Sequence, residues 1–398
     1  MNILVLNCGS SSLKFKLYSM PGEKVILGGE AQRVGVKTNK VSEILIKGDG
    51  LDFSVERELK NHTQAFQEVL VLLKEQLNIS PHNGIEIFGH RYVHPGPFFD
   101  KTTRITEASL KVLKKTLSLA PLHNPIIYDI VEYCYTHYAD TEQYVVFDTS
   151  FHSTIPDSLS SYGIPYEITQ KYGCRKYGFH GISHQYVMEE ACQYRNRLPE
   201  NQNIISLHLG TGGASICAIK KGKSLNSTMG YTPLEGLIMN TRSGDLDAGV
   251  LLSVMYQENL TPEQIETILN KKSGILALYQ KSADLRDIIK SLDHEKEANE
   301  VFQLYISRIH KYLGYYLFLL QSVDMLIFTD TIGCEEPLAR ERICQPLSAF
   351  GIYVDPEKNV SSKQRIFGIS NNQSRADILV VQTDEEKMIA KEVFRQLC

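Results

Sequence analysis

The sequence predicts an α/β protein that contains an internal duplication. Segments with the residue spacing of strands alternate with segments of helical spacing along the chain, which is typical of α/β proteins. A short apolar run, a glycine-containing turn and a second alternating run form a predicted hairpin at residues 2–17, and this pattern returns at residues 203–216. At an offset of 201 positions, Asn2, Ile3, Leu6 and Gly9 recur as Asn203, Ile204, Leu207 and Gly210. We interpret the recurrence as a duplication.

The remaining elements follow in order between and after the two hairpins. We expect strands at residues 85–92, 144–147 and 325–328, and helices at residues 110–119, 124–136, 184–195, 297–320 and 385–397. A chain of 398 residues exceeds one typical core. The duplication therefore predicts two domains with a boundary near residue 150.

Composition bounds the classes of function. The formal net charge is −4, and 42% of the residues are hydrophobic, which predicts a soluble globular protein with no general attraction to nucleic acid or to an anionic membrane. The most apolar late stretch, residues 312–327, is interrupted by polar residues, so we expect no membrane span. The eight cysteines contain no C-x-x-C pair, which predicts free thiols and a cytoplasmic location.

Five polar residues lie in turns or at predicted strand ends, where side chains are available for chemistry. Arg91 and Asp148 follow strand-like runs, while Arg242, His123 and His180 lie in loops rich in small residues. Taken one at a time, each residue also has a purely structural explanation: the arginines could be solvated surface residues, the histidines could be structural, and Asp148 could cap a helix or a turn. Together with two hairpin turns that offer N–H groups from opposite halves, they suggest a clamp for a polyphosphate and phosphoryl transfer.

Several motifs closely resemble those of acetate kinases, in family order and along the whole chain. They are N-C-G-S-S-S-L-K at 7–14, G-H-R at 89–91, A-P-L-H-N-P at 120–125, F-D-T at 147–149, K-Y-G-F-H-G at 176–181, M-G-Y-T-P-L-E-G-L at 229–237, N-K-K-S-G at 270–274 and T-D-E-E at 383–386. The resemblance implies a duplicated ribonuclease H-like (actin-like ATPase) fold with two similar domains around a central cleft. It assigns residues 1–150, joined by a C-terminal helix at about 385–398, to one domain and residues 151–384, with the nucleotide site, to the other.

The resemblance also implies an activity, which is reversible transfer of a phosphoryl group from ATP to acetate. Arg91 and Arg242 would clamp acetate and the moving phosphoryl group, His180 would donate to that group, and His123 would support the site. Asn7 and Glu385 would hold Mg²⁺. A further set would bind the nucleotide: Ser10, Ser12, Lys14, His208, Gly210, Thr211, Gly212, Asp284, Leu285, Arg286, Thr331, Ile332 and Gly333.

An apolar pocket for the acetate methyl group is implied in the same way, lined by Val93, Leu122, Phe179 and Pro233. Because one methylene changes binding by only about 1–3 kcal/mol, propionate is expected to enter as well. Acetate is already ionised at neutral pH, so we expect Asp148 to organise metal or water for a direct in-line transfer. The family further implies a homodimer and the products ADP and acetyl phosphate.

Two nucleotide loops depart from the family pattern. Where the family usually has H-L-G-N-G-S and T-A-G-I-G-E-N, this chain has H-L-G-T-G-G at 208–213 and T-D-T-I-G-C-E at 329–335. Asp330 and Thr331 add charge and bulk where the family has small residues. Three readings therefore stay open: an ATP-dependent acetate kinase, the same chemistry with pyrophosphate or another donor, and a non-enzymatic nucleotide-sensing scaffold.

Overall fold

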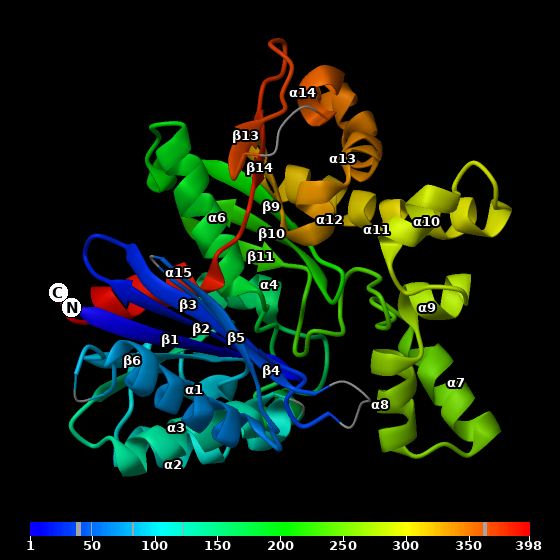
Figure 1. The fold of residues 1–398 in the computed structure, drawn as a ribbon. Coiled ribbons are helices and arrows are strands. Elements are labelled where there is room, and N and C mark those ends of the chain that lie inside the picture. Colours follow the sequence, from blue (N-terminus) through cyan, green and yellow to red (C-terminus); the bar gives the residue numbers. More distant parts are fainter. Residues whose placement is uncertain (37–40, 49, 82, 122, 361–363) are drawn as a thin grey trace. The chain divides into compact units, whose positions relative to one another are not determined.

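The protein is described by a computed structural model that covers residues 1–36, 41–48, 50–81, 83–121, 123–360 and 364–398. The chain forms two compact units (Figure 1). The first unit comprises residues 1–150 together with residues 384–398, and the second comprises residues 151–383.

The first unit is built on an eight-stranded sheet with the strand order β5-β4-β3-β2-β1-β6-β8-β7. In the centre, β1 pairs antiparallel with β2 and parallel with β6, and β6 pairs parallel with β8. The apolar run of β1 is buried on both faces, as expected for a central strand. The strands are β1 (Asn2–Cys8), β2 (Ser12–Ser19), β3 (Lys24–Gln32), β4 (Glu43–Gly48), β5 (Leu51–Glu56), β6 (Ile87–Tyr92), β7 (Thr103–Arg104) and β8 (Glu142–Phe147).

The helices of the first unit pack on this sheet and on one another. They are α1 (His62–Leu77), α2 (Glu107–Lys114), α3 (Asn124–His137) and α15 (Glu385–Arg395). Asn61 caps the start of α1, because its side chain accepts a hydrogen bond from the Gln64 backbone N–H, and Asn78 ends the helix in the left-handed conformation. The C-terminal helix α15 packs against β1, β6 and β8.

The second unit is built on a six-stranded sheet with the order β11-β10-β9-β12-β14-β13. Here β9 pairs antiparallel with β10 and parallel with β12, which pairs parallel with β14. The strands are β9 (Asn203–Leu209), β10 (Ala214–Lys220), β11 (Lys223–Ser227), β12 (Met325–Thr329), β13 (Ile366–Gly368) and β14 (Asp377–Val381).

Eleven α-helices occur in the described part of the second unit. They are α4 (Asp157–Ser160), α5 (Tyr166–Tyr172), α6 (Gly181–Tyr194), α7 (Ala248–Glu258), α8 (Pro262–Lys271), α9 (Gly274–Tyr279), α10 (Leu285–Ser291), α11 (Lys296–Leu320), α12 (Asp330–Glu335), α13 (Pro337–Cys344) and α14 (Pro356–Val360). The longest, α11, buries one stripe of apolar residues three or four positions apart, from Ala298 to Leu320. That stripe attaches α11 to the sheet and to its neighbouring helices.

The two sheets share one topology, which confirms the predicted duplication. The order β3-β2-β1-β6-β8 in the first unit corresponds to β11-β10-β9-β12-β14 in the second, with the same parallel and antiparallel pairings. Helix α6, the third α-helix after β8, packs on β9 of the second sheet, and α15, the helix after β14, packs on β1 of the first sheet. This is the duplicated ribonuclease H-like fold of actin-like ATPases.

One predicted helix is shorter than expected. The helix expected at residues 110–119 starts at Glu107 and ends at Lys114, and a 3₁₀ turn follows at Leu117–Leu119. The buried Thr116 accounts for the difference, because its hydroxyl donates a 2.7 Å hydrogen bond to the Leu113 carbonyl and closes the helix there.

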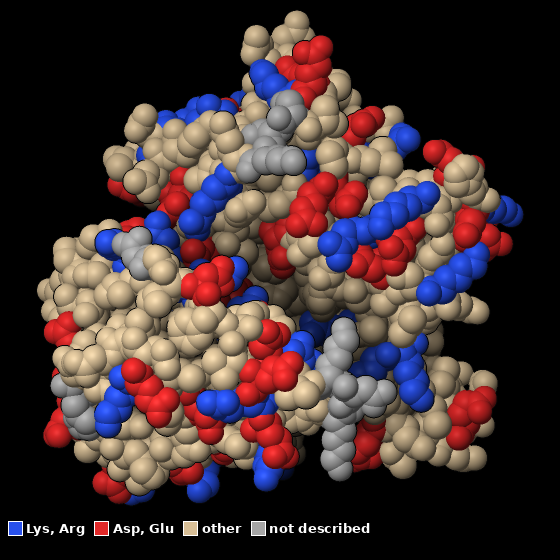
Figure 2. Space-filling model, viewed as in Figure 1, with Lys and Arg blue, Asp and Glu red and all other residues tan. Residues whose placement is uncertain are grey.

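The distribution of charge on the surface and the character of the helices agree with the small net charge and moderate hydrophobic content of the sequence. Basic and acidic side chains are interspersed on the face shown in Figure 2. Among the described residues, none of the helices combines the length and the apolar character that a bilayer crossing requires.

Candidate active site

In the first unit, three predicted site residues lie together because they end neighbouring parallel strands. Asn7 lies near the end of β1, Arg91 lies near the end of β6, and Asp148 directly follows β8. The carboxyl ends of parallel strands meet at one edge of a sheet, where open α/β proteins bind ligands.

Arg91 is the centre of this group. Its Nε donates to Asp148 Oδ1 at 2.7 Å and its Nη2 donates to Asp148 Oδ2 at 2.8 Å, so the pair is bidentate. Its Nη1 lies 2.9 Å from Glu385 Oε2 and 3.1 Å from Asn7 Oδ1. Burial alone would lower the pKa of Arg91, but the charges of Asp148 and Glu385 raise it above its ordinary value. The guanidinium is therefore permanently charged and fixed in direction.

The start of α15 supplies further carboxylates to the same place. Asn7 Nδ2 donates to Glu386 Oε1 at 2.8 Å and to Glu385 Oε2 at 3.3 Å. Lys16 lies 2.9 Å from Asp384 and 3.2 Å from Glu386. The sequence analysis missed Glu386, Asp384 and Lys16. The T-D-E-E motif was the available signal, because it places two further acidic residues beside Glu385.

The turn between β1 and β2 carries the other predicted residues of this unit. Ser10 lies in the turn, while Ser12 and Lys14 begin β2. His62, at the start of α1, was also missed. Its Nε2 shares a 2.9 Å hydrogen bond with the Gly9 carbonyl and so ties the turn to α1.

The remaining first-unit predictions lie on connecting segments. Val93 follows β6 and is buried, and His123 occupies the N-cap position of α3. Leu122 lies outside the described residues.

In the second unit, His180 is presented at the start of α6. It adopts the left-handed conformation with φ +56°, which is uncommon for a residue other than glycine. Its Nδ1 shares a 2.9 Å hydrogen bond with Ser215 Oγ, and the same hydroxyl shares a 2.9 Å bond with His184 Nε2. Burial lowers the pKa of His184 well below its ordinary value, so this ring is neutral. The hydrogen bonds through Ser215 therefore orient the His180 ring from its Nδ1 side.

Arg242 and His180 converge on the turn between β9 and β10. A Cβ atom added at Gly213 would lie 3.3 Å from His180 Nε2 and 3.7 Å from Arg242 Nη1. Within the described residues, no carboxylate lies at ion-pair distance from Arg242, and its Nη1 donates a 3.4 Å hydrogen bond to the Pro233 carbonyl. Burial lowers the pKa of Arg242. A half-buried cation of this kind is prepared to accept an anion from outside the chain.

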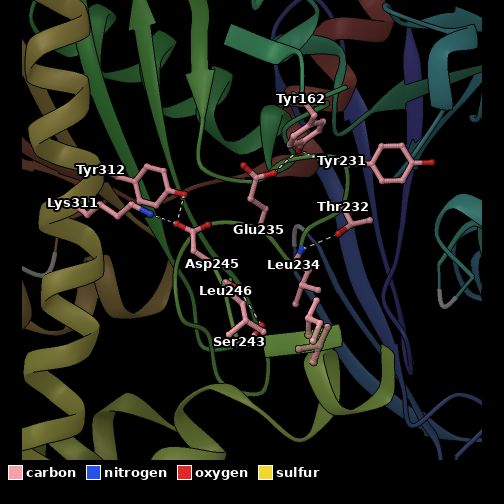
Figure 3. A pocket seen from close by; sticks show the side chains of 13 residues that line it. Tyr162, Tyr231, Thr232, Leu234, Glu235, Ser243, Asp245, Leu246, Lys311 and Tyr312 are labelled. Carbon is pink, nitrogen blue, oxygen red and sulfur yellow. Dashed lines mark hydrogen bonds and ion pairs between the residues drawn. The ribbon is translucent and has the colours of Figure 1, made fainter. Parts of the chain in front are cut away.

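The loop that carries Arg242 is fastened to the long helix α11. Asp245 Oδ1 accepts a 2.9 Å hydrogen bond from the Gly236 N–H, and its Oδ2 lies 2.7 Å from the Tyr312 hydroxyl and 2.5 Å from Lys311 Nζ. Figure 3 shows Lys311 and Tyr312 reaching Asp245 from α11, beside a cavity of about 660 Å³. Asp245 therefore fixes the loop three residues after Arg242.

A second histidine, His208, lies next to the turn that follows β9. His208, on β9, shares a 2.9 Å hydrogen bond with Ser183 through Nδ1 and lies 2.8 Å from Asp330 Oδ2 through Nε2. The rings of His208 and His180 lie 4.2 Å apart between centroids. The predicted phosphate-binding residues Gly210, Thr211 and Gly212 follow directly, so histidines and backbone N–H groups surround one turn.

A second cavity, of about 550 Å³, opens beside α12. Asp330, Thr331 and Glu335 line it, whereas Ile332 and Gly333 are buried in the helix packing. The predicted Asp284, Leu285 and Arg286 lie at the start of α10, and Arg286 joins them to α12 through a 3.4 Å ion pair with Glu335.

Asn7 and Glu385 are the residues predicted to hold Mg²⁺. Throughout the described segments, no group of three or more histidine, cysteine, aspartate or glutamate side chains is arranged to hold a metal ion. Asn7 Nδ2 nevertheless donates a hydrogen bond to Glu385, and the two residues carry one amide oxygen and one carboxylate, both next to Arg91 Nη1. Mg²⁺ commonly takes one or two protein oxygens and completes its shell with phosphate and water, so these residues fit that ion.

The duplicated sheet topology is that of phosphotransferases of the actin-like ATPase class. The chain belongs to the acetokinase family, whose model matches residues 2–391. It is similar to the acetate kinase of Dictyoglomus turgidum, with 41% identity over 99% of this chain and 97% of that protein. The acetate kinase of Dictyoglomus thermophilum is 42% identical, over 99% of each chain.

Solved structures give the same result. The crystal structure of Porphyromonas gingivalis acetate kinase matches with a TM-score of 0.89 and 36% identity over 100% of both chains. A propionate kinase from Francisella tularensis matches with a TM-score of 0.89 and 34% identity over 98% of both chains.

Proposed function

We propose that the chain catalyses reversible transfer of the terminal phosphoryl group of ATP to acetate, giving ADP and acetyl phosphate. Membership in the acetokinase family and the names of the similar proteins support the activity. The observation that carries the proposal is the pair of Arg242 and His180 at Gly213, because the half-buried Arg242 has no carboxylate partner among the described residues. Such a cation is suited to a phosphoryl group in transfer.

The reaction is a direct in-line displacement. An acetate oxygen attacks the terminal phosphorus, the new O–P bond forms, the bond to the ADP oxygen breaks, and ADP carries away the electron pair. Acetate is already ionised, so no residue has to remove a proton from it. Charge spreads over the equatorial phosphoryl oxygens during transfer, and Arg242 and the His180 ring stabilise it with His123 in support.

Arg91 binds the carboxylate of acetate and Asp148 positions it. The sequence analysis assigned metal or water organisation to Asp148, and its bidentate contact with Arg91 favours the positioning role instead. Because both oxygens of Asp148 are engaged, the guanidinium is held in one plane before substrate arrives. Asn7 and Glu385 would hold Mg²⁺, and the ion would neutralise charge on the phosphates.

The acid pocket selects a short chain. Val93 in the first unit and Phe179 in the second are each buried, and each, like Pro233, is proposed as an apolar contact for the methyl group. The structural similarity to a propionate kinase supports propionate as a second acid.

ATP is the proposed donor, and the cavity beside α12 supports it. A space of about 550 Å³ is within the range of small-molecule sites and lies at Thr331, in the loop assigned to the nucleotide. Ser10, Ser12 and Lys14 in the first unit, and the turn at Gly210, Thr211 and Gly212 in the second, bind the phosphates.

The test is an assay of acetyl phosphate formation with acetate and propionate against ATP, GTP and pyrophosphate. We expect turnover with acetate and ATP. Turnover with pyrophosphate alone would replace the donor and keep the chemistry. Absence of turnover with every donor, in a protein that binds nucleotide, would favour the scaffold.

The assembly we propose is a homodimer that uses α7. None of the residues of α7 is buried, although the helix is mainly apolar, and Leu252 and Tyr256 are 54% and 80% exposed. An apolar helix left uncovered marks an interaction surface. Leu252→Glu should convert dimer to monomer in light scattering, while the same change at the exposed Leu198 should not. The eight free cysteines support a reducing, cytoplasmic location.

A further inference from the structure

Asp330 adopts a left-handed backbone conformation at the junction of β12 and α12. Its φ is +63°, in the left-handed region that side chains other than Asn and Asp rarely enter. Strain of this kind persists where surrounding contacts fix it, and it is concentrated at ligand-binding and active sites.

Three contacts fix the Asp330 carboxylate. Oδ2 lies 2.8 Å from His208 Nε2, and Oδ1 accepts hydrogen bonds of 2.6 Å from the Thr331 N–H and 3.0 Å from the Thr331 hydroxyl. Burial would raise the pKa of Asp330, but the His208 ring and the Thr331 donors hold it well below its usual range. The carboxylate is therefore an ionised group built into the second unit.

The carboxylate also touches the glycine turn after β9. A Cβ atom at Gly210 would lie only 2.4 Å from Asp330 Oδ2, so the two segments are in direct contact. His208 is held from its other side, because Ser183 binds Nδ1 and itself donates a 2.9 Å hydrogen bond to Thr383. Asp330 is consequently bound to Nε2 of His208, the ring nitrogen on the side of the Gly210 turn.

We propose that Asp330 is a donor-specificity residue whose carboxylate takes the anion position, between His208 and the Gly210 turn, that a phosphate group of the donor would otherwise occupy. The inference rests on the proposed function, in which this turn binds phosphates. A donor must displace this carboxylate or bind beside it. The resulting loss of binding affinity applies to every polyphosphate but not to an uncharged nucleoside.

This differs from a steric block by Thr331. The Thr331 hydroxyl is turned to Asp330, and Thr331 lines the cavity of about 550 Å³ beside α12. A bulk effect of Thr331 would weaken the nucleoside part of the donor, whereas the charge of Asp330 acts on the phosphates.

The experiment compares Asp330→Asn with Thr331→Gly in the full chain and measures calorimetric dissociation constants for ADP, pyrophosphate and adenosine. Asn keeps the shape and tolerates positive φ. Removal of a charge close to phosphate should tighten ADP and pyrophosphate by a similar factor of at least about tenfold, with adenosine and the KM for acetate unchanged. Asp355→Asn is the matched control, since it removes a carboxylate paired with Lys358 in the same unit.

Unchanged or weaker ADP and pyrophosphate binding in Asp330→Asn would overturn the inference. If Asp330→Asn does not fold, Asp330→Gly relieves the backbone strain and removes the same charge. If Asp330→Asn binds ADP more tightly but the protein shows no turnover, the proposed activity is rejected and the anion position is supported. If the protein turns over normally but Asp330→Asn leaves ADP binding unchanged, the activity is supported and the anion position is rejected.

Discussion

Arg91 and Asp148 form two parallel hydrogen bonds, Nε to Oδ1 at 2.7 Å and Nη2 to Oδ2 at 2.8 Å. The side chains are 19% and 3% exposed. Arg242 contrasts with this arrangement, because within the described chain it has no carboxylate partner. The two arginines assigned to the substrates are therefore held in different ways, and their removal should have different consequences.

Arg91→Ala and Arg242→Ala should each lower kcat by about 10²- to 10³-fold, because each removes a fixed donor from developing negative charge. Only Arg91→Ala should also destabilise the fold, by about 3–5 kcal/mol, since it leaves Asp148 buried without its cation. Steady-state kinetics and urea unfolding measure the two effects. Arg104→Ala, which breaks an exposed pair with Glu142, is the control. Equal stability of the Arg91 and Arg242 variants would contradict the contrast.

Val93→Ala should raise kcat/KM for propionate and butyrate relative to acetate. Loss of two methyl groups enlarges the wall of the proposed methyl pocket, and each methylene changes binding by about 1–3 kcal/mol. Competition assays with the three acids give the ratio. Val71→Ala on the exposed face of α1 makes the same chemical change away from the site. An unchanged acid preference in Val93→Ala would remove Val93 from the pocket.

Asp245→Asn should lower kcat more than it raises either KM. Asp245 fixes the Arg242 loop to α11 through Tyr312 and to the preceding segment through the Gly236 N–H. A small displacement of a catalytic group can cost up to about 100-fold in rate. Tyr312→Phe should give a smaller loss of the same kind. Lys311→Met should have little effect, because Lys311 is 54% exposed and exposed pairs contribute little. A loss confined to KM would show that Asp245 does not position Arg242.

The stability of the protein should fall as the pH is lowered from about 6.5 to about 4. Burial lowers the pKa of His152 from 6.5 to about 4, and that of His184 well below its ordinary value. The unfolded chain therefore binds more protons in this window than the folded chain does. The stability that neutral His152 contributes above pH 6.5 falls by about 2 kcal/mol at pH 5, and His184 acts in the same direction.

The pH dependence of the urea midpoint measures this effect. His152→Gln should flatten the slope, because glutamine does not titrate and can share hydrogen bonds with Ser224 and the Phe179 carbonyl as His152 does. A slope equal to that of the unchanged protein would show that His152 does not contribute.

Much of the framework could be predicted from local pattern. Alternation of apolar and polar residues located both hairpins, and the recurrence of Asn2 at Asn203 matches the first residues of β1 and β9. Arg91 and Asp148 were predicted at the ends of strand-like runs, and the parallel pairing of β6 with β8 brings both ends to one edge of the sheet. These properties depend on residues that are near one another in the chain, so the sequence by itself determined them.

The partners of the charged groups were decided only by the tertiary structure. Asp148 binds Arg91 across 57 positions, Asn7 meets Glu386 across 379, and Lys311 reaches Asp245 across 66. In the sequence Asp330 is only an added charge, and the fold places it on His208 and Gly210. Side-chain pairing at such separations depends on how strands and helices pack, because a carboxylate can bind any cation that the fold brings within about 4 Å.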